Sequence, residues 1–361
     1  MSVIKTTYKL LPTQYKFAYG FDKTKLSDDN IYLDVSLYQG GFTCLPSDAE
    51  YLSPTGWKQI KDLTKQDKLA VYYDDGSIKY EHPKEVFRYP ADEWYEFKTR
   101  TLCQKVCPNH KMVTWKDGHK YVQSMEEFYD EHINSKNGHR GRFKTTFSLN
   151  GSSTGLSENE LRLLIAYQAD GYSYNLGGYS SAFHFCKRRK YDRLLELIKV
   201  SHYDYKLGSL KSGDFRIYVN LPDKLKVKTF PKEWYNLDSK ELETIVEECA
   251  YWDGSIGERH NSYYTSIKEN ADFIQFAGSA SGYRTTLFTR TRPSVSGSGK
   301  PVVEYRINFN NNIEPSLYAT RNKTEIIRSK AKGGDAKYCP STTTGMWLAR
   351  YKNYIFVTGN S

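Results

Sequence analysis

An internal duplication in the second half of the chain constrains its fold more than any other feature. Two segments with helical spacing, "SENELRLLIAYQADG" and "SKELETIVEECAYWDG", both end in Asp-Gly, at Asp170 and Asp253. Ser157 with Glu160 three residues later predicts a capping box, and Ser239 is expected to begin the second helix in the same way. A repeat of this kind indicates two copies of one supersecondary unit.

The similarity continues beyond each Asp-Gly pair. The first copy runs through "KYDRLLELIKVSHYDYKL" to "DFRIYVN", and the second runs through "NADFIQFAGSASGYRTTL" to "EYRINFN". Asp192 to Tyr203 and Asp272 to Tyr283 span the same interval of 11 residues. The sequence therefore predicts helix, strands, helix and strand twice, with loops of different length.

The flanking segments are typical of β-structure. Residues 44 to about 148 contain two stretches in which apolar and polar residues alternate, one around Asp75-Gly76 and one around Asp117-Gly118. The last residues of the chain read as a third hairpin, around Lys352. Each Asp-Gly pair predicts a hairpin because glycine accepts the positive φ of tight hairpin turns. The polar, glycine-rich segment 134–155 indicates a domain boundary.

Composition narrows the possible partners. The 361 residues carry a net charge of +10, which favours a partner with many phosphates. No apolar run is long enough to span a membrane, and the N-terminus lacks the apolar core and cleavage site of a signal peptide, so we expect a cytoplasmic protein.

The six cysteines are too sparse for a disulfide framework. Cys103, Cys107, His110 and His119 could bind a metal ion, but their spacing fits no common zinc pattern. The simpler interpretation places them at the end of one strand and the start of the next.

The residue types at the ends of the β-rich segments could together exchange peptide bonds. Cys44 opens the first piece, Asn360 closes the last, and Ser361 follows. A thiolate can attack the preceding carbonyl to form a thioester, and a hydroxyl can take over that acyl group. An asparagine amide can attack its own carbonyl and cut the chain behind itself.

The sequence around these residues resembles that of inteins. "CLPSDAEYLSPTGWKQIKDL" resembles their N-terminal splicing block, "CPNHKMV" the histidine block, and "YCPSTTTGMWLARYKNYIFVTGNS" the C-terminal blocks. The resemblance covers residues 44 to 360. It implies a β-rich Hint-type splicing domain that acts on its flanking extein segments in cis.

The resemblance also implies residue roles. Cys44 would attack the carbonyl of Thr43, and His110 would protonate the departing Cys44 amine. Ser361 would receive the acyl group, and Asn360 would cyclise to release the intein.

Two positions depart from the family pattern. Cys107 stands where the family usually has a threonine before the histidine, and Gly359 stands where it usually has a histidine before the asparagine. Cys339, in "KYCPS", is a candidate for the missing proton transfers.

The duplicated segments resemble LAGLIDADG (dodecapeptide-type) homing endonucleases, which many inteins carry inside the splicing domain. "LLIAYQADG" keeps the end of the motif, and "VEECAYWDG" keeps Asp-Gly. The resemblance implies an α/β (α+β) domain with pseudo-two-fold symmetry that binds double-stranded DNA as a monomer. Asp170 and Asp253 would share Mg²⁺ ions; the alternative is that each is a turn residue at a helix end.

Basic residues provide candidates for DNA contact. Arg216 and Arg306 occupy matching positions in the two copies, and the run "CKRRK" at 186–190 adds Lys187, Arg188 and Arg189. Solvated surface is the alternative for each of them. His184, His202 and His260 receive no role.

Removal of residues 44–360 would join Thr43 to Ser361 and give "LYQGGFTS". Gly40, Gly41, Thr43 and Ser361 then fill places in the motif GxxxxGK[ST], and "LPTQYKF" offers Gln14 as an adenine contact. The host segment resembles the ATPase of phage terminase large subunits, so we expect the cytoplasm of a phage-infected or bacterial cell.

The expected fold is therefore a β-rich splicing domain split by an α/β endonuclease domain. Its predicted parts are the host segment 1–43, the splicing parts 44–148 and 314–360, the endonuclease 149–313, and the first C-extein residue, 361. Two alternatives stay open: an intein whose endonuclease has decayed, and a basic DNA-binding protein without catalysis.

Overall fold

The computed structural model describes the chain from Cys44 to Gly359 with short gaps. The described ranges are 44–209, 214–255, 261–293, 301–311, 313–319 and 323–359. All of them belong to the second of two units, Met1–Gln39 and Gly40–Ser361. Six residues with predicted roles lie outside the described ranges: Gln14, Gly40, Gly41, Thr43, Asn360 and Ser361.

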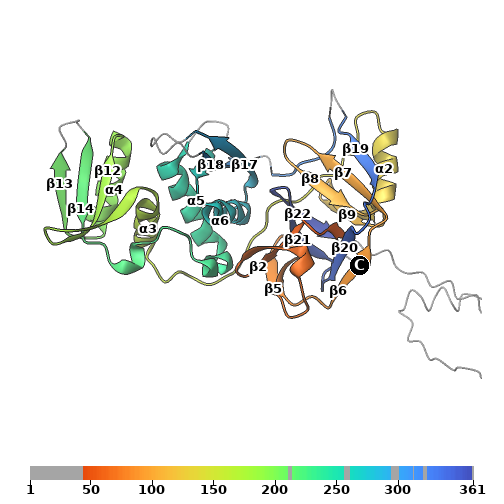
Figure 1. The fold of residues 1–361 in the computed structure, drawn as a ribbon, viewed down its shortest axis with the longest axis horizontal. Coiled ribbons are helices and arrows are strands. Elements are labelled where there is room, and N and C mark those ends of the chain that lie inside the picture. The colour runs from red at the N-terminus through yellow and green to blue at the C-terminus, as the bar shows by residue number, and fades with distance from the viewer. Residues whose placement is uncertain are drawn as a thin grey trace, which may run out of the picture. The chain divides into compact units, whose positions relative to one another are not determined.

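The described chain is β-rich, with several small sheets and five α-helices (Figure 1). None of these helices has the length and apolar character that crossing a membrane requires. The predicted domain boundaries at 148 and 314 stay predictions.

Strands from distant parts of the sequence share sheets in the β-rich module. In the first stretch these are β1 Leu45–Pro46, β2 Glu50–Ser53, β3 Gly56–Gln59, β4 Leu69–Tyr72, β5 Ile78–Glu81, β6 Glu85–Pro90, β7 Glu93–Lys98, β8 Cys103–Val106, β9 Lys111–Lys116 and β10 His119–Ser124. In the last stretch they are β19 Ile326–Lys330, β20 Ala336–Ser341, β21 Met346–Tyr351 and β22 Tyr354–Gly359. A short 3-10 helix, η2 Ile60–Asp62, and helix α2 Met125–Asn134 complete the module.

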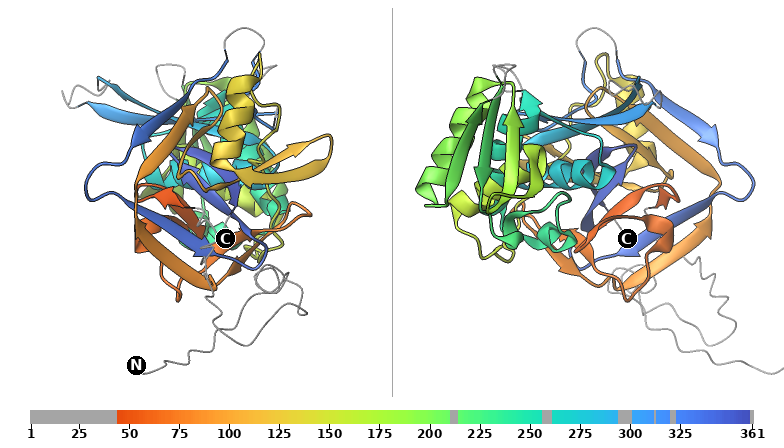
Figure 2. Two further views of the ribbon diagram at one scale, coloured as in Figure 1. Left: turned by 90° about the vertical axis from the view of Figure 1, so that its right-hand side faces the viewer. Right: turned by 60° about the vertical axis from the view of Figure 1, so that its left-hand side comes forward.

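The last strands insert among the first ones. β20 lies between β1 and β6, and β19 pairs with β7, which also pairs with β8. β21 lies between β2 and β4 and pairs as well with β22. The blue strands β20, β21 and β22 beside the orange ones in Figure 2 show this interleaving. All of these pairings are antiparallel.

The three predicted hairpins are confirmed. β4 pairs with β5, β9 with β10, and β21 with β22. Asp117 and Gly118 have φ of 50° and 80°, and Lys352 and Asn353 have φ of 48° and 68°. Two successive positive φ values are the mark of the type I′ turn, whose twist matches that of the strands it joins.

The predicted duplication is also confirmed. The first copy comprises α3 Glu158–Asp170, β11 Gly171–Leu176, β12 Tyr179–Phe185, α4 Arg188–Val200, β13 Tyr205–Ser209 and β14 Phe215–Val219. The second comprises α5 Ser239–Asp253, β15 Gly254–Ser255, β16 Asn261–Thr265, α6 Lys268–Ala280, β17 Arg284–Arg292 and β18 Val302–Asn310. The 3-10 helices η3 Asp223–Leu225 and η4 Lys232–Asn236 connect the copies.

Both copies build a four-stranded sheet with the same topology. The strand orders are β11-β12-β14-β13 and β15-β16-β18-β17. Figure 2 shows α4 lying against the first of these sheets. Because strand order and helix position agree, a residue in one copy can be matched to its counterpart in the other by register.

Both helices begin where the sequence predicts, but only one of the two caps is the predicted residue. Ser157 caps α3, and its capping box with Glu160 is formed. Helix α5 begins at Ser239, as predicted, but its cap is Asp238, which accepts a hydrogen bond from the Lys240 N–H. The Ser239 hydroxyl instead accepts from the Leu149 N–H, a contact that sequence spacing does not reveal.

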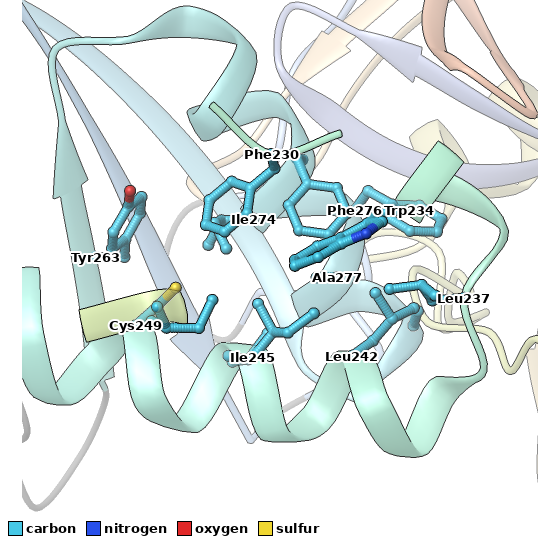
Figure 3. Packing of buried hydrophobic residues seen from close by; sticks show 14 of the residues in the cluster. Phe230, Trp234, Leu237, Leu242, Ile245, Cys249, Tyr263, Ile274, Phe276 and Ala277 are labelled. Atoms are coloured by element: carbon cyan, nitrogen blue, oxygen red, sulfur yellow. The ribbon is translucent and has the colours of Figure 1, made fainter. Parts of the chain in front are cut away.

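Helices α5 and α6 form the centre of the largest core. Leu242, Ile245 and Cys249 project from one face of α5 toward Ile274 and its neighbours on α6 (Figure 3). These α5 positions recur at intervals of three and four residues, the spacing of one helix face. Burial of each such side chain stabilises the fold by roughly 1.5–3 kcal/mol.

Helix α6 is buried far more completely than its counterpart. α4 buries Leu194, Leu197 and Ile198 along one face, whereas most residues of α6 are buried. The reason is a second neighbour: α6 also contacts the β-rich module, where Gln275 donates a hydrogen bond to the Asn353 carbonyl at 2.7 Å.

A buried arginine holds this contact. Arg350 of β21 is 1% exposed and forms two hydrogen bonds to Glu50 of β2, at 2.6 and 2.7 Å. Its other Nη reaches Asp272 of α6 at 2.5 Å, and its guanidinium stacks on Trp57, 4.7 Å from the ring centroid. Two carboxylates from distant parts of the chain thus depend on one cation.

We predict that Arg350→Met lowers the free energy of unfolding by about 3–5 kcal/mol, because it leaves two carboxylates partly buried without their cation. Arg328→Met is the matched control, since Arg328 forms a similar pair with Glu93 at a side chain that is 54% exposed. The control should cost at most about 1 kcal/mol. Urea unfolding of both variants measures the difference, and equal losses would contradict the role given to Arg350.

Candidate active sites

Cys44 lies in a small cluster of cysteines. β1 begins one residue later and pairs with β20, with Leu45 opposite Tyr338, so continuation of the register places Cys44 opposite Cys339. Cys44, Cys107, Cys339 and Trp94 are buried together. The Cys44 N–H donates to Cys107 Sγ at 3.4 Å, and the Cys107 N–H donates to the Cys44 carbonyl at 3.3 Å.

The thiols of this cluster have unequal acidities. Hydrogen bonding to Cys107 and to Cys339, together with burial, raises the pKa of Cys44 far above its ordinary value. Hydrogen bonding from Cys44 lowers the pKa of Cys107, although burial acts in the opposite direction. Cys107 is therefore the group that holds negative charge more readily, and it touches Cys44.

His110 connects this cluster to the other end of the described chain. Its N–H donates to the Cys107 carbonyl at 3.0 Å, which closes a turn just before β9. The buried ring forms a 2.7 Å hydrogen bond between Nε2 and the Thr358 hydroxyl, across 248 residues of sequence. Burial lowers the pKa of His110 to about 3, and the Cys44 backbone partly offsets that effect. The imidazole is therefore neutral.

The Thr358 contact is absent from the sequence prediction. Thr358 stands two residues before Asn360, at the end of β22, and no spacing rule links it to His110. One neutral ring thus interacts with residues from both borders of the β-rich module. For Nδ1 of this ring, the part of the chain that the structure describes offers no hydrogen-bond partner.

The geometry around Gly359 leaves no room for a side chain at this position. A Cβ at this position would lie 2.5 Å from the Lys111 carbonyl oxygen and 2.9 Å from the Lys111 Cβ. Since β22 packs this closely against β9, any larger residue would force the strands apart.

The second candidate site lies where α3 and α5 end. Lys190 Nζ contacts Asp170 Oδ2 at 2.6 Å and Asp253 Oδ1 at 3.4 Å, so both carboxylates reach one ammonium group. The glycine after the second helix is required by space: a Cβ at Gly254 would lie 2.3 Å from the carbonyl oxygens of Ala250 and Ser262. The structure thus places the two predicted aspartates side by side.

Burial and charge act against each other at this pair. Burial raises the pKa of Asp253, and the Lys190 ammonium partly offsets it. Burial lowers the pKa of Lys228, and the charges of Asp170 and Asp253 partly offset this effect. The Lys228 ammonium group donates a hydrogen bond to the Tyr167 carbonyl at 2.8 Å. Carboxylate oxygens that converge on one cation position fit a hard divalent ion such as Mg²⁺.

The basic run before and within α4 is divided among several partners. Lys187 and Arg188 are exposed, and Arg188 pairs with Asp192 at 2.8 Å. Arg189 hydrogen-bonds the Tyr251 carbonyl, and its guanidinium lies over the Tyr251 ring. Lys190, the last residue of the run, contacts both aspartates of the pair. Contact of Lys187, Arg188 and Arg189 with DNA stays a prediction.

Arg216 and Arg306 occupy equivalent registers in the two sheets. Arg216 lies opposite His184 and Gly208, and Arg306 lies opposite Tyr264 and Phe288. Arg306 is exposed and lies over the Phe288 ring, while Arg216 is half-buried and donates to the Tyr218 hydroxyl at 3.3 Å.

The group Cys103, Cys107, His110 and His119 does not form a metal site in the described residues. Cys103 is buried in the second core cluster, whereas His119 is exposed on β10. His184, for which sequence analysis identifies no partner, pairs with Asp214 at 3.1 Å.

Comparison with known proteins gives remote similarities. No family model matches the chain. It is 26% identical to ribonucleoside-diphosphate reductase subunit beta of Aquifex aeolicus (strain VF5) over 88% of this chain and 50% of that protein. It is 39% identical to the ATP-dependent Clp protease proteolytic subunit of Chlamydomonas moewusii over 19% of this chain and 7% of that protein. The chain thus spans half of the first relative and a small part of the second.

Two solved structures are among the similar folds. The AceL NrdHF class 3 split intein has a TM-score of 0.34 at 10% identity, covering 88% of this chain and 98% of that one. The homing endonuclease I-DmoI in complex with DNA and Ca has a TM-score of 0.29 at 11% identity, covering 42% of this chain and 83% of that one. These scores are too low to assign a function, which must rest on the residues of this chain.

We predict that burial of His110 makes the free energy of unfolding decrease as the pH falls. The unfolded chain binds a proton on this histidine near pH 6.5, whereas the folded chain binds it only near the folded pKa of about 3. The free energy of unfolding should therefore decrease as the pH falls between these values, by up to about 1.4 kcal/mol per pH unit from this group.

Urea unfolding at several pH values between 7 and 4 measures this effect. His110→Gln should reduce the slope relative to wild type, and His119→Gln, at an exposed position, controls for the loss of an imidazole. Identical slopes for wild type and His110→Gln would show that the buried ring takes up a proton in the folded state.

Proposed function

We propose that residues 44–360 form an intein, a Hint-type splicing domain that excises itself and joins its flanking segments. Residues 149–313 would form an embedded homing endonuclease of the LAGLIDADG type. One observation carries the splicing proposal: the buried His110 ring hydrogen-bonds Thr358 and lies beside the Cys44 backbone. The residues next to both splice junctions therefore meet at one imidazole.

The first step transfers the Thr43 acyl group from nitrogen to sulfur. Cys44 Sγ attacks the Thr43 carbonyl carbon, a C–S bond forms, and the C–N bond to Cys44 breaks. Cys107, which touches Cys44 and has a lowered pKa, takes the thiol proton first. That proton passes to His110, which is neutral before and after the step, and His110 delivers it to the departing amine, so the net change is one proton moved from sulfur to nitrogen.

The later steps use the residues after β22. The Ser361 hydroxyl attacks the thioester and releases the Cys44 thiol. The Asn360 side-chain amide then attacks its own carbonyl, which cuts the chain before Ser361, and an O-to-N shift leaves an ordinary peptide bond. Because Gly359 offers no side chain, we assign the proton transfers of this step to Thr358, two residues before Asn360 in the chain, and to its hydrogen-bond partner His110. Cys339 lies instead with Cys44.

We predict that the chain with a short extension after Ser361 yields two products in a mass spectrum, the excised residues 44–360 and the ligated flanks. Cys44→Ala should abolish ligation, and Asn360→Ala should abolish cleavage after residue 360. Asn150→Ala, at an exposed asparagine, is the matched control and should splice normally.

The same assay tests the contact that distinguishes this proposal. Thr358→Val keeps the shape of the side chain but removes the hydroxyl, and it should slow splicing by about 5- to 100-fold, the cost of a buried hydrogen bond. Thr358→Ser should restore most of the rate. Equal rates for the valine and serine variants would remove Thr358 and His110 from the mechanism.

The aspartate pair supports the endonuclease proposal. Asp170 and Asp253 would hold Mg²⁺, and such an ion activates water and stabilises the leaving oxygen in phosphodiester hydrolysis. Lys190 contacts both carboxylates and must move or share them when an ion binds. Arg216 and Arg306, in equivalent registers of the two sheets, would contact double-stranded DNA.

We predict that the wild-type protein with Mg²⁺ cuts a plasmid that carries the uninterrupted coding sequence of the insertion site. Asp170→Asn should lose cutting and keep splicing, and Asp223→Asn, at an exposed aspartate, should keep both. If wild type splices but leaves the plasmid intact, the endonuclease has decayed and splicing is the remaining activity.

The host assignment rests on the flanks alone. After ligation, Gly40, Gly41, Thr43 and Ser361 would belong to the phosphate-binding loop of a phage terminase ATPase, with Gln14 as an adenine contact. The codons after Ser361 decide this assignment, because the loop requires Gly-Lys-Ser/Thr next.

A further inference from the structure

Three side chains of metal-binding type meet at the edge of the first repeat. They are His184 and Cys186, at and just beyond the end of β12, and Asp214, just before β14. One ligand atom from each lies within 4.8 Å of the others, and His184 Nε2 is 3.1 Å from Asp214 Oδ2. This group lies outside the two sites described above.

Strand register explains the meeting. β12 and β14 are antiparallel, with Phe185 opposite Phe215, so the next pair along the strands brings Cys186 opposite Asp214. Phe185 is buried on the inner face of the sheet, and side chains alternate along a strand. His184 and Cys186 therefore share the outer face, where both are exposed. Figure 1 shows β12 and β14 as neighbours.

The ligand set and spacing fit zinc. In a tetrahedral zinc site the ligand atoms are about 3.5 Å apart, given metal–ligand distances of about 2.0–2.3 Å. The observed separations, within 4.8 Å, exceed this value by at most about 1.3 Å, which small movements of these surface side chains can close. Imidazole, thiolate and carboxylate together suit borderline-soft Zn²⁺ better than Mg²⁺, which takes oxygen ligands.

The second repeat provides an internal comparison. Tyr264 lies opposite Arg306 as His184 lies opposite Arg216, so by register Tyr264, Ser266 and Glu304 correspond to His184, Cys186 and Asp214. There the carboxylate of Glu304 is held by Arg290 at 2.7 Å and Arg292 at 3.2 Å. The carboxylate position is thus kept in both copies and bound by cations in the second. In the first copy His184 and Cys186, both suited to zinc, stand where the second copy has Tyr264 and Ser266.

We propose that His184, Cys186 and Asp214 bind one Zn²⁺ ion through three protein ligands, with water at the fourth position. The ion would fix the start of α4, since Cys186 directly precedes Lys187, an N-cap without a side-chain cap hydrogen bond. α4 in turn carries Lys190 to the aspartate pair. The proposal does not depend on splicing or on DNA cleavage.

Cobalt binding tests the site in the full chain, kept intact by Cys44→Ala and Asn360→Ala. Co²⁺ should produce a thiolate charge-transfer band that saturates at one equivalent and disappears when Zn²⁺ is added. His184→Tyr with Cys186→Ser, the residues of the second repeat, should abolish the band. His119→Ala should retain it.

Thiol labelling gives a second readout. Of the six cysteines Cys186 alone is exposed, so a thiol reagent should modify one residue quickly, and stoichiometric Zn²⁺ should protect it. Zn²⁺ should also raise the melting temperature of the parent and leave that of the double variant unchanged. A missing band at one equivalent, or an equal band in the double variant, would mean that the three side chains form only a hydrogen-bonded group.

Discussion

The buried guanidinium of Arg350 is the interaction on which the rest of the described structure depends. It joins Glu50 of the first stretch, Asp272 of the second repeat and its own strand β21. β21 continues through a type I′ turn into β22, which presents Thr358 to His110. A buried cation between two carboxylates costs much free energy when either partner is lost, so it fixes this geometry firmly.

Duplication supplied two copies of one unit, and the contacts of each copy then diverged. Asp192 in the first repeat pairs only with Arg188 of its own helix among the ion pairs described, whereas its counterpart Asp272 also reaches Arg350. The second repeat is therefore attached to the β-rich module. The first repeat keeps an amphipathic α4 and supplies Lys190 to the aspartate pair.

The two candidate sites use burial in different ways. Burial keeps His110 neutral, and hydrogen bonding to Cys107 and Cys339, together with burial, raises the pKa of Cys44 and keeps its thiol protonated. Hydrogen bonding from Cys44 lowers the pKa of Cys107. At the helix ends, two partly exposed carboxylates share the ammonium group of Lys190, which offsets part of their charge. The first environment suits proton transfer between buried groups, and the second suits exchange of one cation for another.

The sequence by itself determined the features that a few neighbouring residues encode. The turns at Gly118 and Asn353, the capping box at Ser157 and the ends of α3 and α5 all depend on local geometry, and they were predicted. Tertiary structure alone decided the Thr358–His110 bond, the Lys190 bridge, the Arg350 network and the close approach that requires Gly359. It also gave Ser239 a distant partner and made Asp238 the cap. These contacts join different helices and strands, and the packing of helices and the pairing of strands set them, so no local pattern carries them.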